Sequence, residues 1–464
     1  MLGVMAELQA RLARMEAELA AAHARIAQLE AENGELRRLL EDERRKGKRQ
    51  ASPFAKALKK DPKEPGRKRG SEYGSHSRRS IPKKIDRRET VQCPMWCPHC
   101  HGLVKLDHVE RQYQTDIPLV RPTTVEFTIQ VGVCEQCGRH VRDRHPEQTS
   151  EGTGSVGGVQ IGPRAIALAT HLNKSCGMSW ERIAALMGQV FQLEVSRSGL
   201  CRALRRLACR GQPLFDKLRE QIHNEPVVSP DETGWRVGGE PAWLHVAASP
   251  TTTVYLIAHG RGYAEAEFLL GAGFAGMLAV DGWGPYRGFD LAVIQNCLAH
   301  LLRRSAGLQD VPRSKESRQW LEAISTRLKQ ALALRDRRDD YSEFGYAIAC
   351  GRLEAAFDRL LDDPALDDDT LKFAAYLVRT RHEIFVFLDE PNLPATNYLA
   401  EQAIRPAVVN RKMSGGNRTW AGADDQAVVT SLLRTWAQRG RNIIQSCVAL
   451  LTAATPAKAL ALVR

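Results

Sequence analysis

The chain has 464 residues and 43% of them are hydrophobic, enough for roughly three domains and at least one sizeable core. Its formal net charge is +12, which points to an anionic partner. No run of about 18 apolar residues exists, which excludes a transmembrane helix. The charged, Ala-rich N-terminus also lacks the apolar segment of a secretory signal, so we expect a cytoplasmic protein without a membrane partner.

Residues 5–40 carry a heptad repeat. One core position is taken by Met5, Leu12, Leu19, Ile26, Asn33 and Leu40, and the other by Leu8, Met15, Ala22, Leu29 and Leu36. This spacing predicts a coiled coil over residues 1–43. A buried Asn33 would set its register and favour two strands, so we expect a homodimer. The alternative is a single amphipathic helix packed on the body of the protein.

Residues 44–90 are basic and rich in Pro, Gly and Ser. Between Arg44 and Arg88 there are 18 Lys or Arg against 4 Asp or Glu, so this segment carries the whole basic excess. Without periodic apolar residues it is predicted to be a flexible arm. Such a charge density favours contact with a nucleic acid backbone over a simple solvated linker.

Residues 91–146 contain five of the 11 cysteines. The pairs Cys97-x2-Cys100 and Cys134-x2-Cys137 are typical of two knuckles that hold one structural Zn²⁺ through four thiolates. The run TTVEFTIQVGVC in this segment is β-rich, so we expect a small zinc-ribbon-like domain. Residues that could replace a ligand are Cys93, His99, His101 and His140. Unmetallated thiols are the alternative.

Residues 160–222 are predicted to be helical, with the layout of a helix-turn-helix in SWERIAALMGQVFQLEVSRSGLCRALRRLA. Ser179 can cap a first helix through Met187, and a second helix is expected from Ser196 or Ser198. The second helix presents Arg202, Arg205 and Arg206, which suits contact with DNA. A helical bundle with a solvated basic face explains the same pattern equally well.

Residues 226–300 alternate between strand and helix patterns, which predicts an α/β core. Strands are expected at VVSPDETGWRV, AWLHVAAS, TTVYLIAHG, GMLAVDGW and VIQNC, and a helix at YAEAEFLLG. Residues 301–390 are almost wholly helical. Further helices are expected from Pro394 to residue 409 and within 425–452.

Three carboxylates stand where such a core could bring them together. Asp231 and Asp281 each end a predicted strand, and in an RNase H-like sheet the first and fourth strands are neighbours. Glu401 lies on a later helix and shares a face with Asn397 and Arg405. Glu232 is expected to point to the opposite face of its strand, because side chains alternate. Thr233 and Gly234 are then expected to form a tight exit from the strand.

Converging carboxylates repel each other unless cations are present. Asp231, Asp281 and Glu401 together therefore predict a site for two Mg²⁺ or Mn²⁺ ions, which prefer oxygen ligands. Such a pair of ions supports in-line displacement at phosphorus.

With these motifs in place, the chain resembles bacterial transposases of the insertion sequence 66 family, whose core belongs to the DDE (RNase H-like) class. DETGWRV, VDGWGPY and NYLAEQAIRPAVVNRKMSGG are similar to the three catalytic blocks, in order. The resemblance implies a triad of Asp231, Asp281 and Glu401, with a helical insertion at about 301–390 in a core spanning 226–452 and a tail at 453–464. DNA phosphate is expected at some of the basic residues Arg405, Arg411, Lys412 and Arg418.

The family also has a Cys-x2-His element after the second Asp, matched by Cys297 and His300 in QNCLAHLLRR. This chain has Leu298 and Leu301-Leu302 where the family has Trp and a basic pair, which favours simple packing for the two residues. The final block has MSGGNRT where the family more often has aromatic residues.

The resemblance implies a nucleoid-associated bacterial DNA transposase that cleaves at the terminal inverted repeats of its own element. The freed 3′-hydroxyl would then attack target DNA, with accessory proteins of the element as further partners. Two alternatives stay open: a catalytically inactive DNA-binding derivative or repressor of transposition, and an RNase H-like nuclease that only hydrolyses.

Overall fold

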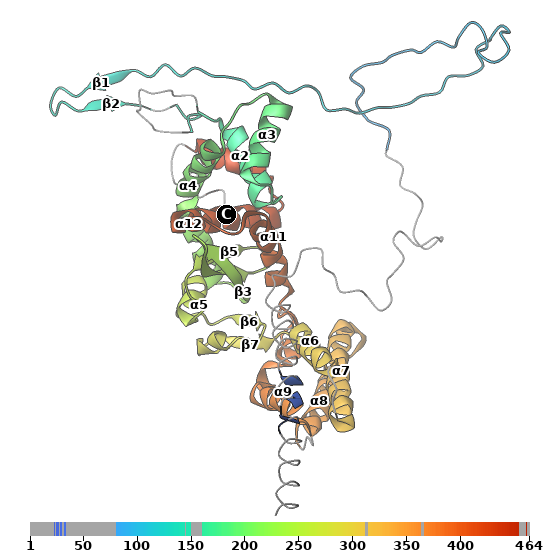
Figure 1. Cartoon of the computed structure of the whole chain (residues 1–464), viewed down its shortest axis with the longest axis vertical. Coiled ribbons are helices and arrows are strands. Elements are labelled where there is room, and N and C mark those ends of the chain that lie inside the picture. Colours follow the sequence, from blue (N-terminus) through green and yellow to red (C-terminus); the bar gives the residue numbers. More distant parts are fainter. Residues whose placement is uncertain are drawn as a thin grey trace, which may run out of the picture. The chain divides into compact units, whose positions relative to one another are not determined.

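The computed structural model describes residues 80–143, 145–149, 160–310, 314–362 and 366–453, and singly residues 23, 25, 26, 28, 29, 32, 33 and 461. The chain divides into two units, Met1–Ile117 and Pro118–Arg464 (Figure 1). The seven single positions from His23 to Asn33 are helical. The rest of the predicted coiled coil and most of the basic arm lie outside the described residues.

The cysteine-rich segment contains little regular structure. In the first unit, an isolated bridge joins Trp96 to Leu103 around the first cysteine pair. In the second unit, the hairpin of β1 (Val131–Val133) and β2 (His140–Arg142) surrounds the second pair. The β-rich run TTVEFTIQVGVC is therefore a strand only at Val131–Val133. Of its earlier apolar residues, Val125 (57%) and Ile129 (39%) are exposed with no core to pack on, and Phe127 is only half-buried.

Three helices follow, as predicted: α2 (Pro163–Lys174), α3 (Trp180–Phe191) and α4 (Arg197–His223). Ser179 caps α3 by accepting a hydrogen bond from the Arg182 N–H at 3.3 Å, and Ser196 caps α4 through the Gly199 N–H at 3.1 Å. Helix α3 continues past Met187 to Phe191. The 27 residues of α4 include a long apolar half, so this helix continues from the turn into the main core.

A five-stranded mixed sheet forms the centre of an α/β core. Its strands are β3 (Val227–Val237), β4 (Glu240–Ala248), β5 (Thr253–Ala258), β6 (Met277–Val280) and β7 (Val293–Asn296), in the order β5-β4-β3-β6-β7. Strands β3, β4 and β5 pair antiparallel, whereas β6 runs parallel to β3 and β7 parallel to β6. The first and fourth strands are thus neighbours, as predicted.

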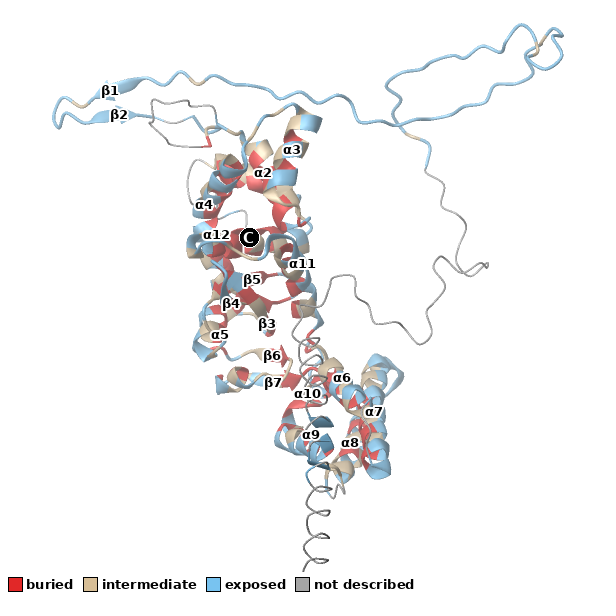
Figure 2. Cartoon of the chain, in the orientation of Figure 1, coloured by how far each residue is buried: buried red, intermediate tan, exposed pale blue. Residues whose placement is uncertain are grey.

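Helices cover both faces of the sheet (Figure 2). On one face, α4, α5 (Tyr263–Leu270), α12 (Trp420–Gln438) and α13 (Ile443–Thr452) build the largest apolar cluster together with Val228, Val254 and Val280. On the other face, α11 (Tyr398–Ser414) packs on Trp235, Val246 and Tyr255. Because successive side chains of β3 face opposite sides of the sheet, Asp231 points to the α11 face and Glu232 to the other face.

The residues between β7 and α11 form the predicted helical insertion. It comprises α6 (Leu298–Gln309), α7 (Lys315–Asp336), η3 (Arg338–Asp340), α8 (Glu343–Leu361), α9 (Asp368–Arg379), η4 (Arg381–Glu383) and α10 (Val386–Asp389). These helices have their own apolar cluster, which reaches the sheet at Val227 and Ala279. Within the described part of the chain, no helix is both long and apolar enough to cross a membrane.

Candidate active site

Asp231 lies in the middle of β3 rather than at its end. Strand β4 pairs with β3 from Ser229 to Val237, so the predicted exit at Thr233 and Gly234 is wrong and the strand turns only after Val237. On its other edge, β3 pairs with β6 only at Val227 and Val228. Pairing between β3 and β6 therefore stops before Asp231, although β3 itself continues, and the two strands separate there.

Asp281 directly follows β6, as predicted. Its Oδ1 accepts a hydrogen bond from the Trp283 N–H at 3.0 Å. Gly282 between them has φ +95°, and a Cβ there would lie 2.3 Å from the hydroxyl of Tyr376. Only glycine fits this position, which turns the chain sharply away from the strand end and leaves the Asp281 carboxylate beside β3.

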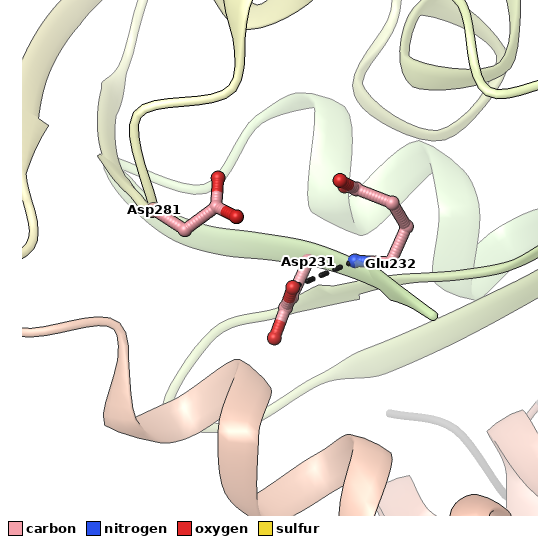
Figure 3. A group of neighbouring side chains, drawn as sticks. All are labelled: Asp231, Glu232 and Asp281. Carbon is pink, nitrogen blue, oxygen red and sulfur yellow. Dashed lines mark hydrogen bonds between the residues drawn. The ribbon is translucent and has the colours of Figure 1, made fainter. Parts of the chain in front are cut away.

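Asp231, Glu232 and Asp281 form a group whose carboxylate oxygens lie within 4.8 Å of one another (Figure 3). The pKa of Asp231 is raised to about 7: burial contributes most, the nearby charges of Asp281, Glu232 and Glu401 add to it, and the Glu232 N–H opposes it. Within the described residues, neither aspartate has an ion-pair partner. This all-oxygen donor set fits a hard divalent cation such as Mg²⁺ or Mn²⁺.

Glu232 points to the opposite side of β3 from Asp231, as the alternation predicts (Figure 3). Its buried carboxylate accepts hydrogen bonds from Arg261 Nε at 2.9 Å and from the Tyr286 hydroxyl at 2.8 Å. The guanidinium of Arg261 stacks between the rings of Trp243 and Trp283, at 4.8 and 4.7 Å. The charge of Glu232 is therefore already compensated, unlike those of the two aspartates.

Glu401 lies in the first turn of α11, on the face of the sheet to which Asp231 points. It is close enough to raise the pKa of Asp231, but it does not belong to the 4.8 Å group. Its carboxylate is bound by Arg303 of α6, and His300 Nε2 lies 3.8 Å from the same oxygen. The pair is partly exposed, with Glu401 at 40% and Arg303 at 58% of their side-chain surface.

Sequence patterns did not identify Arg261, Tyr286 or Arg303 as partners of the acidic residues. The only local signal for Arg303 is its place one helical turn after His300, on the same face of α6. Burial lowers the pKa of His300, and Arg303 lowers it further, against the raising effect of Asp281 and Glu401. Near neutral pH the imidazole is therefore neutral, so the cationic partner of Glu401 is Arg303.

The predicted DNA-binding residues differ in their availability. Exposed side chains belong to Arg202, Arg205, Arg405, Lys412 and Arg418, whereas Arg206 is half-buried. Arg411 is half-buried as well. It donates hydrogen bonds to the Gly234 carbonyl and, at 3.4 Å, to the Thr233 hydroxyl. Arg411 therefore holds α11 against β3, and its guanidinium is only partly available to a phosphate.

The two cysteine pairs adopt the same local turn, each within its own unit. The Cys97 N–H donates to the Gly102 carbonyl at 2.8 Å, and the Cys134 N–H donates to the Arg139 carbonyl at 2.9 Å. The fifth residue of each turn, His101 or Gly138, has a positive φ of 60° or 67°.

Backbone N–H groups of these turns lower the pKa of the first thiol of each pair. For Cys97 the N–H of His99 contributes most, and for Cys134 the N–H of Cys137. A lowered thiol pKa favours the thiolate, which is the form that binds a metal ion.

Residues 158–425 match the family model described as Transposase IS66 family. The match covers more than half of the chain, from before α2 to the first turns of α12. This family, together with the acidic site at the sheet edge, defines the class of protein: a DNA-processing enzyme. The chain belongs to the IS66 transposase family. No curated protein matches it.

Proposed function

We propose that the chain is a DDE transposase with an RNase H-like core, which cleaves DNA at the ends of its own element and joins the 3′-hydroxyl to target DNA. The observation that carries this proposal is the pair Asp231–Asp281, brought together by the parallel pairing of the first and fourth strands. The strand order β5-β4-β3-β6-β7 supports the RNase H-like assignment. Membership of a transposase family supports the reaction class.

We propose Asp231, Asp281 and Glu401 as the catalytic carboxylates. Two divalent ions bound there would activate the attacking oxygen and stabilise the leaving one. The residues of the chain position the scissile phosphate and keep the three carboxylates at the sheet edge. Glu232 is assigned a supporting role, because Arg261 and Tyr286 already compensate its charge.

The exposed basic residues support contacts to DNA phosphate at two places. Arg202 and Arg205 lie near the start of α4, and Arg405 and Lys412 on one exposed side of α11, with Arg418 following. Because α11 also carries Glu401, a strand held by its basic side would run toward the carboxylates. The arm at 44–90 would add affinity that does not depend on DNA sequence.

A structural Zn²⁺ held by Cys97, Cys100, Cys134 and Cys137 is part of the same proposal. The matching turns and the lowered thiol pKa values support it. Metal analysis of the purified chain should find one zinc per chain, and Cys97→Ser together with Cys134→Ser should remove it. Retention of zinc by the double variant would argue against this ligand set.

A homodimer formed through the coiled coil at 1–43 would hold two element ends together. Light scattering on the full chain tests this, with a variant carrying Leu12→Ser and Leu19→Ser as the comparison. The proposal requires a dimer for the first and a monomer for the second. Recognition of the terminal repeats and any need for accessory proteins are tested with the element's own ends.

The decisive experiment is Mg²⁺-dependent cleavage of a duplex that carries an element end, followed by a strand-transfer assay with target DNA. The wild type should produce a 3′-hydroxyl end and join it. Asp231→Ala and Glu401→Gln should bind the duplex without cutting it, whereas Glu232→Gln should keep measurable cleavage. Cleavage without joining would favour a hydrolytic nuclease, and a wild type that binds but never cleaves would favour an inactive derivative.

A further inference from the structure

We propose that Cys297 and Asn397 form a buried hydrogen-bonded junction that holds the three carboxylates in register. Both are positioning residues, since neither needs to touch DNA or metal. The inference rests on the proposed function, because it concerns the site formed by Asp231, Asp281 and Glu401. It gives a specific role to a cysteine whose sequence context favours simple packing.

Cys297 connects the second carboxylate to the third. It follows β7 and stands at the start of α6, where its N–H donates to the Val280 carbonyl at 2.7 Å. Val280 immediately precedes Asp281. The Sγ of Cys297 accepts a hydrogen bond from the backbone N–H of Asn397 at 3.2 Å. The end of β6 and the start of the helix that carries Glu401 are thus tied to the same residue.

Asn397 connects the third carboxylate to the first. Its carbonyl accepts the Glu401 N–H at 3.1 Å, as the residue that begins α11. Its side-chain Nδ2 donates to the carbonyl of Pro230 at 2.9 Å, directly before Asp231. The regular β3–β6 pairs stop at Val228, so the amide of Asn397 supplies a partner to β3 beyond the last pair.

The junction is buried. Cys297 is 1% exposed and Asn397 is fully buried. Leu298 N–H adds a bond to the Ala395 carbonyl at 2.9 Å, which joins the same two segments. Loss of one partner in such a place leaves a buried polar group unsatisfied, which destabilises the arrangement. The segments would move to relieve it, and the carboxylates would move with them.

The chemistry of Cys297 fits a hydrogen-bonding role rather than that of a nucleophile. Burial raises the pKa of its thiol, against the lowering effect of the N–H groups of Asn397, His300 and Ala299. The thiol is therefore neutral at neutral pH, and its sulfur accepts the Asn397 N–H as a weak acceptor. A serine at this position keeps an acceptor on a shorter side chain, whereas alanine removes it.

The test compares Cys297→Ala, Cys297→Ser and Asn397→Ala with the wild type, in the full chain. Calorimetry measures Mn²⁺ binding without DNA, a cleavage assay gives the Mg²⁺ concentration at half-maximal rate, and thermal unfolding gives Tm. The matched control is Cys447→Ala, which removes an equally buried cysteine from the main apolar cluster far from these bonds.

We expect Cys297→Ala and Asn397→Ala to weaken Mn²⁺ binding about tenfold and to raise the Mg²⁺ requirement similarly. Cys297→Ser should recover most of the loss, and Cys447→Ala should lower Tm while leaving metal binding unchanged. Wild-type affinity for Mn²⁺ in Cys297→Ala overturns the inference, as does a loss that Cys447→Ala reproduces at the same Tm. A wild type that binds no Mn²⁺ overturns the proposed function itself, together with this inference.

Discussion

Two places on the same sheet bury carboxylates in opposite ways. Near the insertion, Glu383 accepts two hydrogen bonds from Arg287, each 2.6 Å long, and a third from Asn296 Nδ2 at 2.9 Å. At the β3–β6 edge, Asp231 accepts the N–H of Glu232 at 2.8 Å and no other hydrogen bond from the residues that the structure describes, and its pKa is raised to about 7. One carboxylate is fully compensated by the chain, and the other is not.

This difference teaches where a ligand is expected. A largely buried carboxylate without a cation destabilises the folded state, so packing alone does not explain Asp231, which is half-buried at the sheet edge. Glu383 bridges η4 to the loop after Asp281, since Arg287 also donates to the Gly282 carbonyl at 3.2 Å. Glu383, whose charge is compensated, holds the loop in place, whereas Asp231, whose charge is not, is where a cation is expected.

The largest contrast is expected from Asp231→Asn. It should reduce Mg²⁺-dependent cleavage about 10³-fold or more, because a metal ligand is lost. In EDTA at pH 8 the same change should raise the free energy of unfolding by about 1–2 kcal/mol, since a buried charge disappears. Cleavage kinetics and urea denaturation measure the two effects. Asp290→Asn, at an exposed position, serves as control and should change neither. A cleaving Asp231→Asn protein would remove the functional side of the comparison.

Glu383→Gln should act in the opposite sense. It leaves the half-buried guanidinium of Arg287 without its counter-charge, which should lower the free energy of unfolding by about 2 kcal/mol. Replacing both partners, as Arg287→Met with Glu383→Leu, should recover much of that loss. A double-mutant cycle in urea measures the coupling. A loss in the double variant equal to the sum of the single losses would mean that Arg287 and Glu383 are not coupled, and that the pair contributes little to holding the insertion.

The pH dependence of stability tests the raised pKa of Asp231 without any mutation. The folded-state pKa of Asp231 is raised from 3.8 to about 7, so the folded state binds more protons than the unfolded state between these values. Stability of the metal-free protein should therefore fall as pH rises from about 4 to 7, by up to about 4 kcal/mol from this group at about 1.4 kcal/mol per pKa unit, and level off above about pH 8.

Saturating Mg²⁺ should flatten this fall, and Asp231→Asn should remove its share of it. Denaturation in EDTA and in Mg²⁺ at five pH values provides the measurement. A fall of the same size in the Asp231→Asn protein would assign it to other groups.

The sequence was sufficient to predict the strands and the helical character of 301–390, because both depend on local apolar periodicity. The neighbouring first and fourth strands and the role of 301–390 as an insertion were implied by the resemblance to RNase H-like transposases. The sequence was insufficient for the length of β3. The expected exit at Thr233 and Gly234 placed the end of the strand at Asp231. The structure tolerates Pro230, which has no N–H to donate, because β3 and β6 no longer pair beyond Val228; at that edge the Pro230 carbonyl accepts a hydrogen bond from Asn397, 167 residues later. No local pattern encodes a contact over such a distance.

The environment of each carboxylate was also beyond local patterns. Alternation along β3 predicts that Glu232 faces away from Asp231, but not that Arg261 and Tyr286 wait on that side. Likewise, the helix face shared by Asn397, Glu401 and Arg405 was predicted, whereas the pairing of Glu401 with Arg303, 98 residues before it, depends on the tertiary fold. In the cysteine-rich segment, β propensity predicted more strand than the structure contains. A strand forms only at Val131–Val133, because the neighbouring apolar residues have no core to pack on.

The smallest effect on stability is expected at the partly exposed pair Arg303–Glu401. Glu401 has a cationic partner in Arg303, so its charge is compensated more than that of Asp231 and less than that of Glu383. Because both side chains are partly exposed, Arg303→Gln should change the free energy of unfolding by about 0.5 kcal/mol or less. The freed Glu401 should nevertheless strengthen Mn²⁺ binding in the absence of DNA about threefold, since a metal ion no longer competes with a guanidinium.

Arg304→Gln is the matched control. The Arg304 guanidinium stacks on Phe373 and Tyr376, at 4.9 Å from each ring, and its removal should leave Mn²⁺ affinity unchanged. Calorimetry on both variants decides the point. Unchanged affinity in Arg303→Gln would place Glu401 with the compensated carboxylates and outside the metal site, so that Asp231 and Asp281 would need their third ligand from Glu232.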